Sequence, residues 1–147
     1  MTPVDLLQFL RLHRWAVEAS VSAQQAPEAA LIGFAVTDQF EIVFDTIVST
    51  RKVQNLRANP HVALVIGGWG QDARTVQLEG VVDEPTGAEL DRLTRAYVAV
   101  FPEGLTGQQL PGLVYFRVRP TWVRYSDYNQ QPPFVMEFSA DTLKALR

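Results

Sequence analysis

The chain contains no cysteine, and only two of its 147 residues, His13 and His61, are histidines. A protein without cysteine forms no disulfide, carries no thiolate nucleophile and builds no zinc–sulfur site. Two histidines also argue against a multi-histidine metal centre within one chain. No pattern typical of hydrolytic or covalent catalysis is present, so the residues identify neither a catalytic group nor a metal ligand.

Long apolar runs and an excess of positive charge are also absent. No stretch approaches the roughly 20 apolar residues of a membrane-spanning helix, and the first five residues lack the basic start of a signal peptide. The chain has 13 Lys and Arg against 16 Asp and Glu, which gives a formal net charge of −3. Nucleic acids and anionic membranes attract basic proteins, so we expect neither as a partner and expect a cytoplasmic location.

The composition that remains is that of a globular protein. Hydrophobic residues make up 47% of the chain and charged residues 20%, and this length predicts one domain over residues 1–147. Short turns join most predicted elements without βαβ alternation, which favours an antiparallel barrel or sheet with helices at its ends, an α+β arrangement. Apolar patterning predicts strands over 15–22, 30–36, 40–46, 62–66, 74–82, 113–125 and 134–138. Capping signals predict helices that begin at Thr2, Arg51 and Thr86, and the last of these has a Thr86–Glu89 capping box. A further helical turn is predicted over 141–146.

Three of these predicted strands carry more specific expectations. Alternation over 40–46 places Phe40 and Phe44 on one face of the sheet. The run over 62–66 is continuously apolar, so we expect a central strand that is buried on both faces. The long strand over 113–125 is predicted to bend at Pro120.

A hydroxyl-rich turn and a pair of cations stand at the start of the predicted helix over 51–58. Ser49 and Thr50 end the turn, and Arg51 and Lys52 open the helix. Cations in the first turn of a helix are disfavoured, because that end already carries partial positive charge. Hydroxyls, free N–H groups and two cations in one place therefore predict an anion site, for which phosphate fits best. The alternative is a Thr N-cap followed by two solvated cations, and the residues alone leave both interpretations open.

A wider pattern runs through residues 30–80. It consists of Phe44-Asp45-Thr46, then Ser49-Thr50-Arg51-Lys52, then Asn55-Leu56 and Asn59-Pro60, then an apolar strand, then Thr75-Val76-Gln77-Leu78-Glu79-Gly80. In order and spacing this pattern resembles the pyridoxamine 5′-phosphate oxidase-related family of FMN-binding split barrels. The resemblance implies a mainly β member of the α+β class, a six- to seven-stranded antiparallel split β-barrel with peripheral helices. It also implies a homodimer with FMN at the subunit interface.

The resemblance assigns roles to individual residues. In such proteins the Ser/Thr-Arg-Lys group holds the flavin phosphate, which corresponds here to Thr50, Arg51 and Lys52, with Ser49 beside them. The preceding strand would lie along the isoalloxazine ring, and the strand around Thr75 would supply polar contacts to the ring or the ribityl chain. The full set of cofactor-binding residues expected on this basis is Val43, Phe44, Asp45, Thr46, Ser49, Thr50, Arg51, Lys52, Thr75 and Gln77.

The function that the resemblance implies is that of an FMN-binding flavoprotein, an oxidoreductase acting on a small-molecule redox substrate. Relatives of this fold use the deazaflavin F420 or haem instead, or bind flavin without known catalysis, so these remain alternatives. Two departures separate the chain from true pyridoxamine-phosphate oxidases. Ala30 stands where many carry an arginine, and residues 125–147 show no match to the arginine- and histidine-bearing segment that grips the vitamin phosphate. Vitamin B6 oxidation is therefore not expected.

Overall fold

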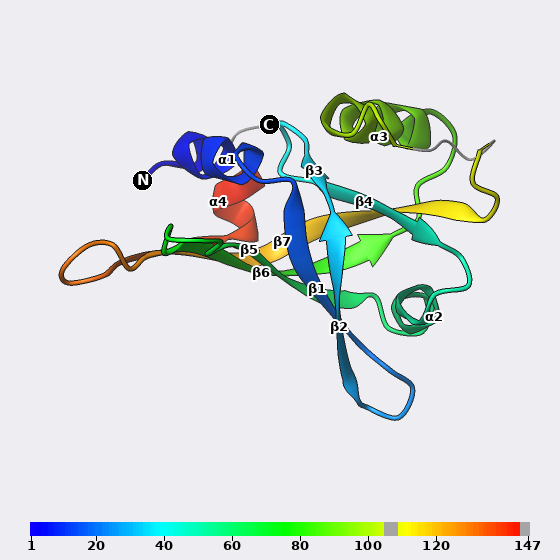
Figure 1. Cartoon of the computed structure of the whole chain (residues 1–147), viewed down its shortest axis with the longest axis horizontal. Coiled ribbons are helices and arrows are strands. Elements are labelled where there is room, and N and C mark those ends of the chain that lie inside the picture. The colour runs from blue at the N-terminus through cyan, green and yellow to red at the C-terminus, as the bar shows by residue number, and fades with distance from the viewer. Residues whose placement is uncertain (105–108, 145–147) are drawn as a thin grey trace.

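The computed structural model describes residues 1–104 and 109–144. Within these described residues, eight strands form one antiparallel sheet, and four helices surround it (Figure 1). The strands are β1 (Trp15–Val21), β2 (Pro27–Gly33), β3 (Ala35–Val36), β4 (Ile42–Ile47), β5 (His61–Gly67), β6 (Arg74–Asp83), β7 (Leu113–Asp127) and β8 (Phe134–Ser139), and the helices are α1 (Pro3–Arg11), α2 (Arg51–Ala58), α3 (Gly87–Val100) and α4 (Ala140–Lys144). Residues 145 and 146 of the predicted C-terminal helical turn lie outside the described residues.

The order of strands forces the sheet to curl. Hydrogen-bonded neighbours follow the order β2-β1-β5-β6-β7-β4-β3, and β8 pairs with β7 off this path. The two strands at the ends of this order, β2 and β3, are separated in the chain by Phe34 alone. The sheet must therefore bend round until its ends meet, which confirms the predicted mainly β, α+β split barrel.

Phe34 also explains why one predicted strand is two in the structure. Its N–H donates to the carbonyl of Arg14 at 2.9 Å, which extends the β1–β2 register by one residue, whereas the next residue, Ala35, pairs with Val43 of β4. Its side chain is fully buried in the core. The predicted strand over 30–36 is thus divided at this residue. The predicted bend in β7 is confirmed, since the register with β6 shifts at Glu79 and Gly80, opposite Trp122 and Pro120.

Strand β5 differs from its prediction in burial. Val62, Leu64 and Ile66 point into the core, but Val65 is 43% exposed on the other face. The expectation of burial on both faces is therefore wrong. An apolar run does not distinguish a strand covered on both sides from one whose second face stays open.

The open face of β5 continues onto its neighbours. Directly opposed residues of an antiparallel pair lie on the same face, and the register aligns Leu31, Val17, Val65 and Gln77 across β2, β1, β5 and β6. We refer to the apolar part of this surface as the outer face, which consists of Val17, Ala19, Ala29, Leu31, Ala63 and Val65.

Strand β4 is buried on both sides. It begins at Ile42, because Phe40 has a positive φ of 59° and belongs to the preceding turn. The prediction that Phe40 lies within the strand is wrong, although its side chain still joins that of Phe44 in the main core. Val43 points the other way and packs in a second cluster with Leu93 of α3.

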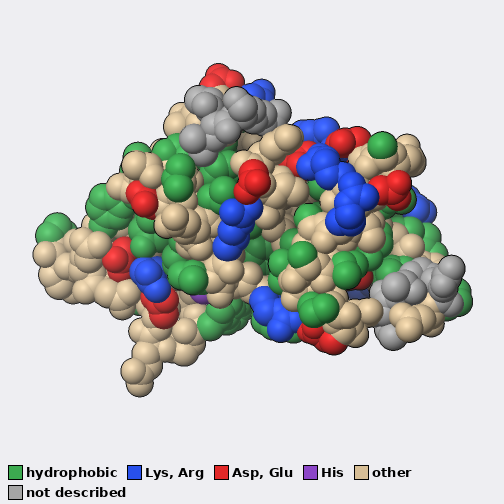
Figure 2. Space-filling model, turned by 90° about the horizontal axis from the view of Figure 1, so that it is seen from above, with side chains coloured by type: hydrophobic (Ala, Val, Ile, Leu, Met, Phe, Trp, Pro, Cys, Tyr) green, Lys and Arg blue, Asp and Glu red, His purple; other side chains and the backbone are tan. Residues whose placement is uncertain are grey.

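Ion pairs fasten α3 to the sheet. Arg117 of β7 is only 5% exposed, and it donates to Asp83 at 2.7 Å, to Glu89 at 2.6 Å and to Glu41 at 3.2 Å. Arg92 of α3 also donates to Glu41 and Glu89. The predicted capping box is wrong for this reason: Glu89 serves the arginines, and within the described chain no side chain caps α3 at Thr86. Figure 2 shows cationic and acidic side chains interspersed on the face that carries α1 and α3.

Replacing Arg117 tests this network. Arg117→Met should lower the free energy of unfolding by about 3 kcal/mol at pH 7, because it leaves buried Glu41 short of a partner. Arg117 lowers the pKa of Asp83, so this stabilisation is present near neutrality and is lost as pH falls through that lowered pKa. Urea denaturation at pH 7 and pH 3 measures both effects. The control is Arg119→Met, whose half-exposed side chain forms an ion pair with Asp83. An equal loss in the control would contradict the assignment.

Candidate functional site

An open cavity of about 600 Å³ lies between β1, β2 and the first turn of α2. The four residues of the predicted anion site, Ser49 to Lys52, all line it. The cavity is completed by side chains from the β1–β2 hairpin, which the sequence alone does not place there. These hairpin residues are Glu18, Ser20, Glu28, Ala29 and Ala30.

The start of α2 leaves hydrogen-bond donors for a ligand. Thr50 is the N-cap residue, with φ −73° and ψ 153°, yet its side chain makes no capping hydrogen bond in the described structure. The N–H groups of the first turn have no acceptor within their own helix. The hydroxyl of Thr50 lies 3.2 Å from that of Thr46, and the ammonium of Lys52 donates to Thr46 at 3.4 Å. Hydroxyls, a cation and free N–H groups therefore converge, as an anion requires.

Packing fixes α2 in this place. Val53 and Leu56 are buried in the core, and Asn55, 6% exposed, donates from Nδ2 to the hydroxyl of Ser20 at 3.1 Å. The helix is thereby tied to β1, and its first turn is held at the mouth of the cavity. The predicted stop at Asn59 is confirmed, since Asn59 is the C-cap residue.

Two carboxylates in the cavity were missed by the sequence reasoning. Glu28 accepts a hydrogen bond from Arg51 at 2.8 Å, and this pair holds the guanidinium although Arg51 is largely exposed. Glu18 is 1% exposed, and its Oε1 has no hydrogen-bond partner among the described residues. Burial raises the pKa of Glu18, and Lys52 opposes this rise. The sequence held a signal for Glu18, because alternation along this predicted strand places it on the same face as Ala16, an apolar position.

The strand predicted to lie along a flavin ring contributes little side chain to the cavity. Val43 and Phe44 are fully buried in the two core clusters. Asp45 accepts from the hydroxyl of Tyr97 at 2.9 Å, and burial raises the pKa of its carboxyl. Beyond Val43, the β4 edge facing β3 pairs with no other described strand. What this segment offers a ligand is the side chain of Thr46 and a free backbone edge.

Thr75 and Gln77 lie on β6 and are not among the described residues that line the cavity. Gln77 is exposed and stands opposite Val65, in the same row as the outer face. Glu18 stands opposite Leu64 on β5, so it lies on the inward face of the sheet. The structure therefore does not bring Gln77 together with the cavity within one chain.

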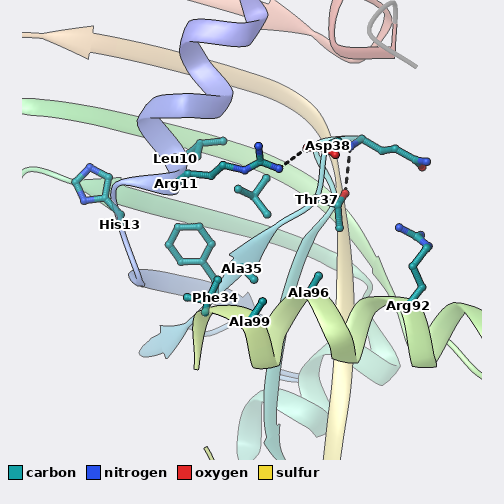
Figure 3. Close-up of a pocket in the computed structure, with 13 residues that line it drawn as sticks. Leu10, Arg11, His13, Phe34, Ala35, Thr37, Asp38, Arg92, Ala96 and Ala99 are labelled. Carbon is teal, nitrogen blue, oxygen red and sulfur yellow. Dashed lines mark hydrogen bonds and ion pairs between the residues drawn. The ribbon is translucent and has the colours of Figure 1, made fainter. Parts of the chain in front are cut away.

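A second cavity, of about 590 Å³, lies between α1, β3 and α3 (Figure 3). Its cations already have partners: Arg11 is paired with Asp38, and Arg92 with Glu41 and Glu89. None of the predicted site residues is among the described residues that line it.

Within residues 1–104 and 109–144, no group of acidic or histidine side chains is arranged to hold a metal ion. No helix in those ranges is long and apolar enough to span a bilayer.

Comparison with known proteins supports the resemblance seen in the sequence. Residues 4–127 match the family model described as pyridoxamine 5′-phosphate oxidase. The chain belongs to this family. A pyridoxine/pyridoxamine 5′-phosphate oxidase of Burkholderia vietnamiensis is 35% identical over 74 residues, which cover 50% of this chain and 34% of that protein. The match thus spans about a third of the length of the curated relative.

Solved structures of the same fold carry different names. A haem-binding protein from Mycobacterium smegmatis superposes with a TM-score of 0.81 at 15% identity, over 99% of this chain and 61% of that protein. An FMN-binding, pyridoxamine 5′-phosphate oxidase-related protein from Nostoc punctiforme has a TM-score of 0.67 at 12% identity, over 93% of this chain and 86% of that one. At these identities the likeness establishes the fold alone.

The hydrogen bond between Asn55 and Ser20 should have a measurable effect on stability. Asn55→Ala removes it and leaves the Ser20 hydroxyl buried, so the free energy of unfolding should fall by about 1–3 kcal/mol. Urea denaturation provides the measurement, and Gln54→Ala, on the exposed side of the same helix, is the matched control. If both variants were as stable as the wild type, Asn55 would not be what anchors α2 to β1.

Proposed function

We propose that the protein is a homodimeric FMN-binding flavoprotein that holds the flavin phosphate at the start of α2. The observation that carries this proposal is the convergence of an uncapped helix start, two hydroxyls and two cations on one cavity. Family membership supports it independently.

The residues present fit a phosphate group. Lys52 and Arg51 would neutralise its charge, Thr50 would donate a hydrogen bond, and the N–H groups of the first turn of α2 would face its oxygens. Arg51 would exchange its present partner, Glu28, for the phosphate. The free edge of β4 from Phe44 to Thr46 would offer backbone groups to the rest of the cofactor.

The outer face is the surface we assign to the dimer. Val65 is 43% exposed and Leu31 61% exposed, and they lie in one continuous row with Val17. Burying such apolar area contributes about 25 cal/mol per Å². Gln77 stands in the same row, at the border of this face. A dimer formed here would place polar groups of one chain, Thr75 and Gln77, at the interface where the cofactor of its partner would lie.

The proposed activity is that of an oxidoreductase with a small-molecule redox substrate. FMN, when bound, would supply the electron or hydride chemistry through its own ring, and the chain would position the ring and exclude water. The name of the Burkholderia relative supports an oxidase-type reaction. Oxidation of vitamin B6 compounds is not proposed, because Ala30 and the residues after 125 depart from that pattern.

Haem is the second candidate, because two structural neighbours, from Mycobacterium smegmatis and Vibrio cholerae, are named as haem proteins. FMN is favoured here, because none of the described residues lining the cavity is a histidine. The absorption spectrum of the freshly purified protein separates flavin, F420 and haem. Reduction of a bound flavin by NAD(P)H would support an enzyme, whereas a flavin that resists every reductant would support a carrier or sensor.

Removing both cations tests the phosphate site. Arg51→Ala/Lys52→Ala should fold and dimerise but lose FMN affinity by about 100-fold, since hydrogen bonds to charged groups contribute about 1.5–3 kcal/mol each and 1.4 kcal/mol corresponds to a factor of ten. Isothermal titration calorimetry measures the loss. Arg11→Ala/Arg119→Ala removes the same charge elsewhere and should bind as the wild type does. Undiminished binding by the Arg51/Lys52 variant would overturn the site.

A charge on the outer face tests the dimer. Val65→Glu should convert the dimer to a monomer and weaken FMN binding, because a carboxylate would be desolvated in the interface. Size-exclusion chromatography with light scattering gives the mass. Val98→Glu on α3 is a matched control, since Val98 is 41% exposed outside this face. A Val65→Glu protein that remained dimeric would show that another surface forms the dimer.

A further inference from the structure

We propose that Glu18 makes anion binding in this cavity proton-coupled: a phosphate group enters as Glu18 takes up a proton from solvent. The inference rests on the proposed function, because it concerns the same cavity. It goes beyond that function by naming a residue that sets how the affinity for phosphate depends on pH.

The position of Glu18 leaves its carboxylate only partly compensated. It is 1% exposed, lines the cavity and has one oxygen without a hydrogen-bond partner among the described residues. Directly opposite it stand Ala30 on β2 and Leu64 on β5. Neither neighbouring strand therefore presents a cation at this position. A buried carboxylate with an unsatisfied oxygen is costly in free energy.

The charged groups around Glu18 come from two other elements. From α2, Lys52 lies close enough to stabilise its negative charge, and from β2, Glu28 destabilises it. Arg51 of α2 is engaged by Glu28, and Ser20 on β1 offers a hydroxyl. The two cations and two carboxylates of the cavity balance, so a phosphate dianion meets no net positive charge while both carboxylates are ionised.

Glu18 is the carboxylate whose protonation state must change when phosphate binds. Glu28 is partly exposed, so water can screen its charge when Arg51 turns to a phosphate. Glu18 is buried beside Lys52, the other group that would bind the phosphate, and like charges in one site raise the pKa of the carboxyl. Once protonated, Glu18 has an O–H that can donate to a phosphate oxygen. Repulsion is then replaced by a hydrogen bond, and the affinity should fall as pH rises.

The experiment is calorimetric titration of FMN into the wild type and Glu18→Gln between pH 6 and 8.5. Buffers with different ionisation enthalpies report the number of protons taken up. If binding takes up one proton, the affinity of the wild type for FMN falls by up to about tenfold for each unit that the pH rises. This pH dependence adds to the one that both proteins share because the phosphate group itself titrates. Glu18→Gln should lose that extra slope and bind about tenfold more tightly than the wild type at pH 8, because each pH unit costs the wild type up to about that factor.

Two further variants sharpen the test. Glu28→Gln also removes a carboxylate from the cavity but should keep the proton uptake, because Glu18 remains. Ala30→Arg places a cation opposite Glu18 and should abolish the uptake while leaving both carboxylates present. It also tests the inference if Glu18→Gln fails to fold.

The outcomes separate the two proposals. If FMN binds the wild type and Glu18→Gln with the same pH slope and the same proton count, the proton coupling is overturned and the cofactor site stands. If FMN binds neither protein at any pH, the cofactor assignment is overturned. The same titrations with inorganic phosphate then decide the coupling, since the titration of phosphate itself is common to both proteins.

Discussion

The closure of the sheet is the constraint on which the rest of the molecule depends. Because β2 and β3 occupy opposite ends of the strand order and only Phe34 lies between them in the chain, the sheet cannot be flat. Curling encloses the main core, turns the outer face away from it, and leaves the edge of β4 beyond Val43 without a described strand partner on that side. The cavity lies where the hairpin of β1 and β2 approaches the turn that follows this edge, so closure brings together residues that are far apart in sequence.

Two carboxylates stabilise the cationic start of α2 when no ligand is bound. Arg51 and Lys52 oppose the partial charge of the helix end, and an unligated chain must compensate for them in another way. Glu28 does so directly by pairing with Arg51, and Glu18 does so from within the cavity near Lys52. The same carboxylates compete with an incoming anion. If the cavity binds phosphate as proposed, stability of the free protein and affinity for phosphate are therefore opposed.

The parts of this structure that were predictable are those encoded locally. The helix signals at Thr2 and Arg51 each lie within a few consecutive residues, and so do the four residues from Ser49 to Lys52 that line the cavity together. Glu18 and Glu28 could not be placed in the cavity from the sequence, because that depends on the register between strands and on where α2 packs. The prediction that β5 is buried on both faces was wrong for a related reason. An apolar run shows that the strand is hydrophobic, but it does not show which elements cover each face of the strand. The positions of Thr75 and Gln77 relative to a cofactor stay a prediction, because they depend on a second chain.

The balance of charge in the cavity has a kinetic consequence. A chain with a formal net charge of −3, whose proposed anion site has two cations and two carboxylates among its described lining residues, would exert no long-range attraction on a phosphorylated molecule. Electrostatic steering, which accelerates encounter in strongly charged sites, would therefore be absent, and association with the proposed site would proceed at the ordinary rate of unsteered diffusion. At the proposed site, discrimination between ligands would then lie in the dissociation rate of each one, which short-range contacts with Thr50, Lys52 and the first turn of α2 would set. Such a site keeps what fits it and does not concentrate anions in general.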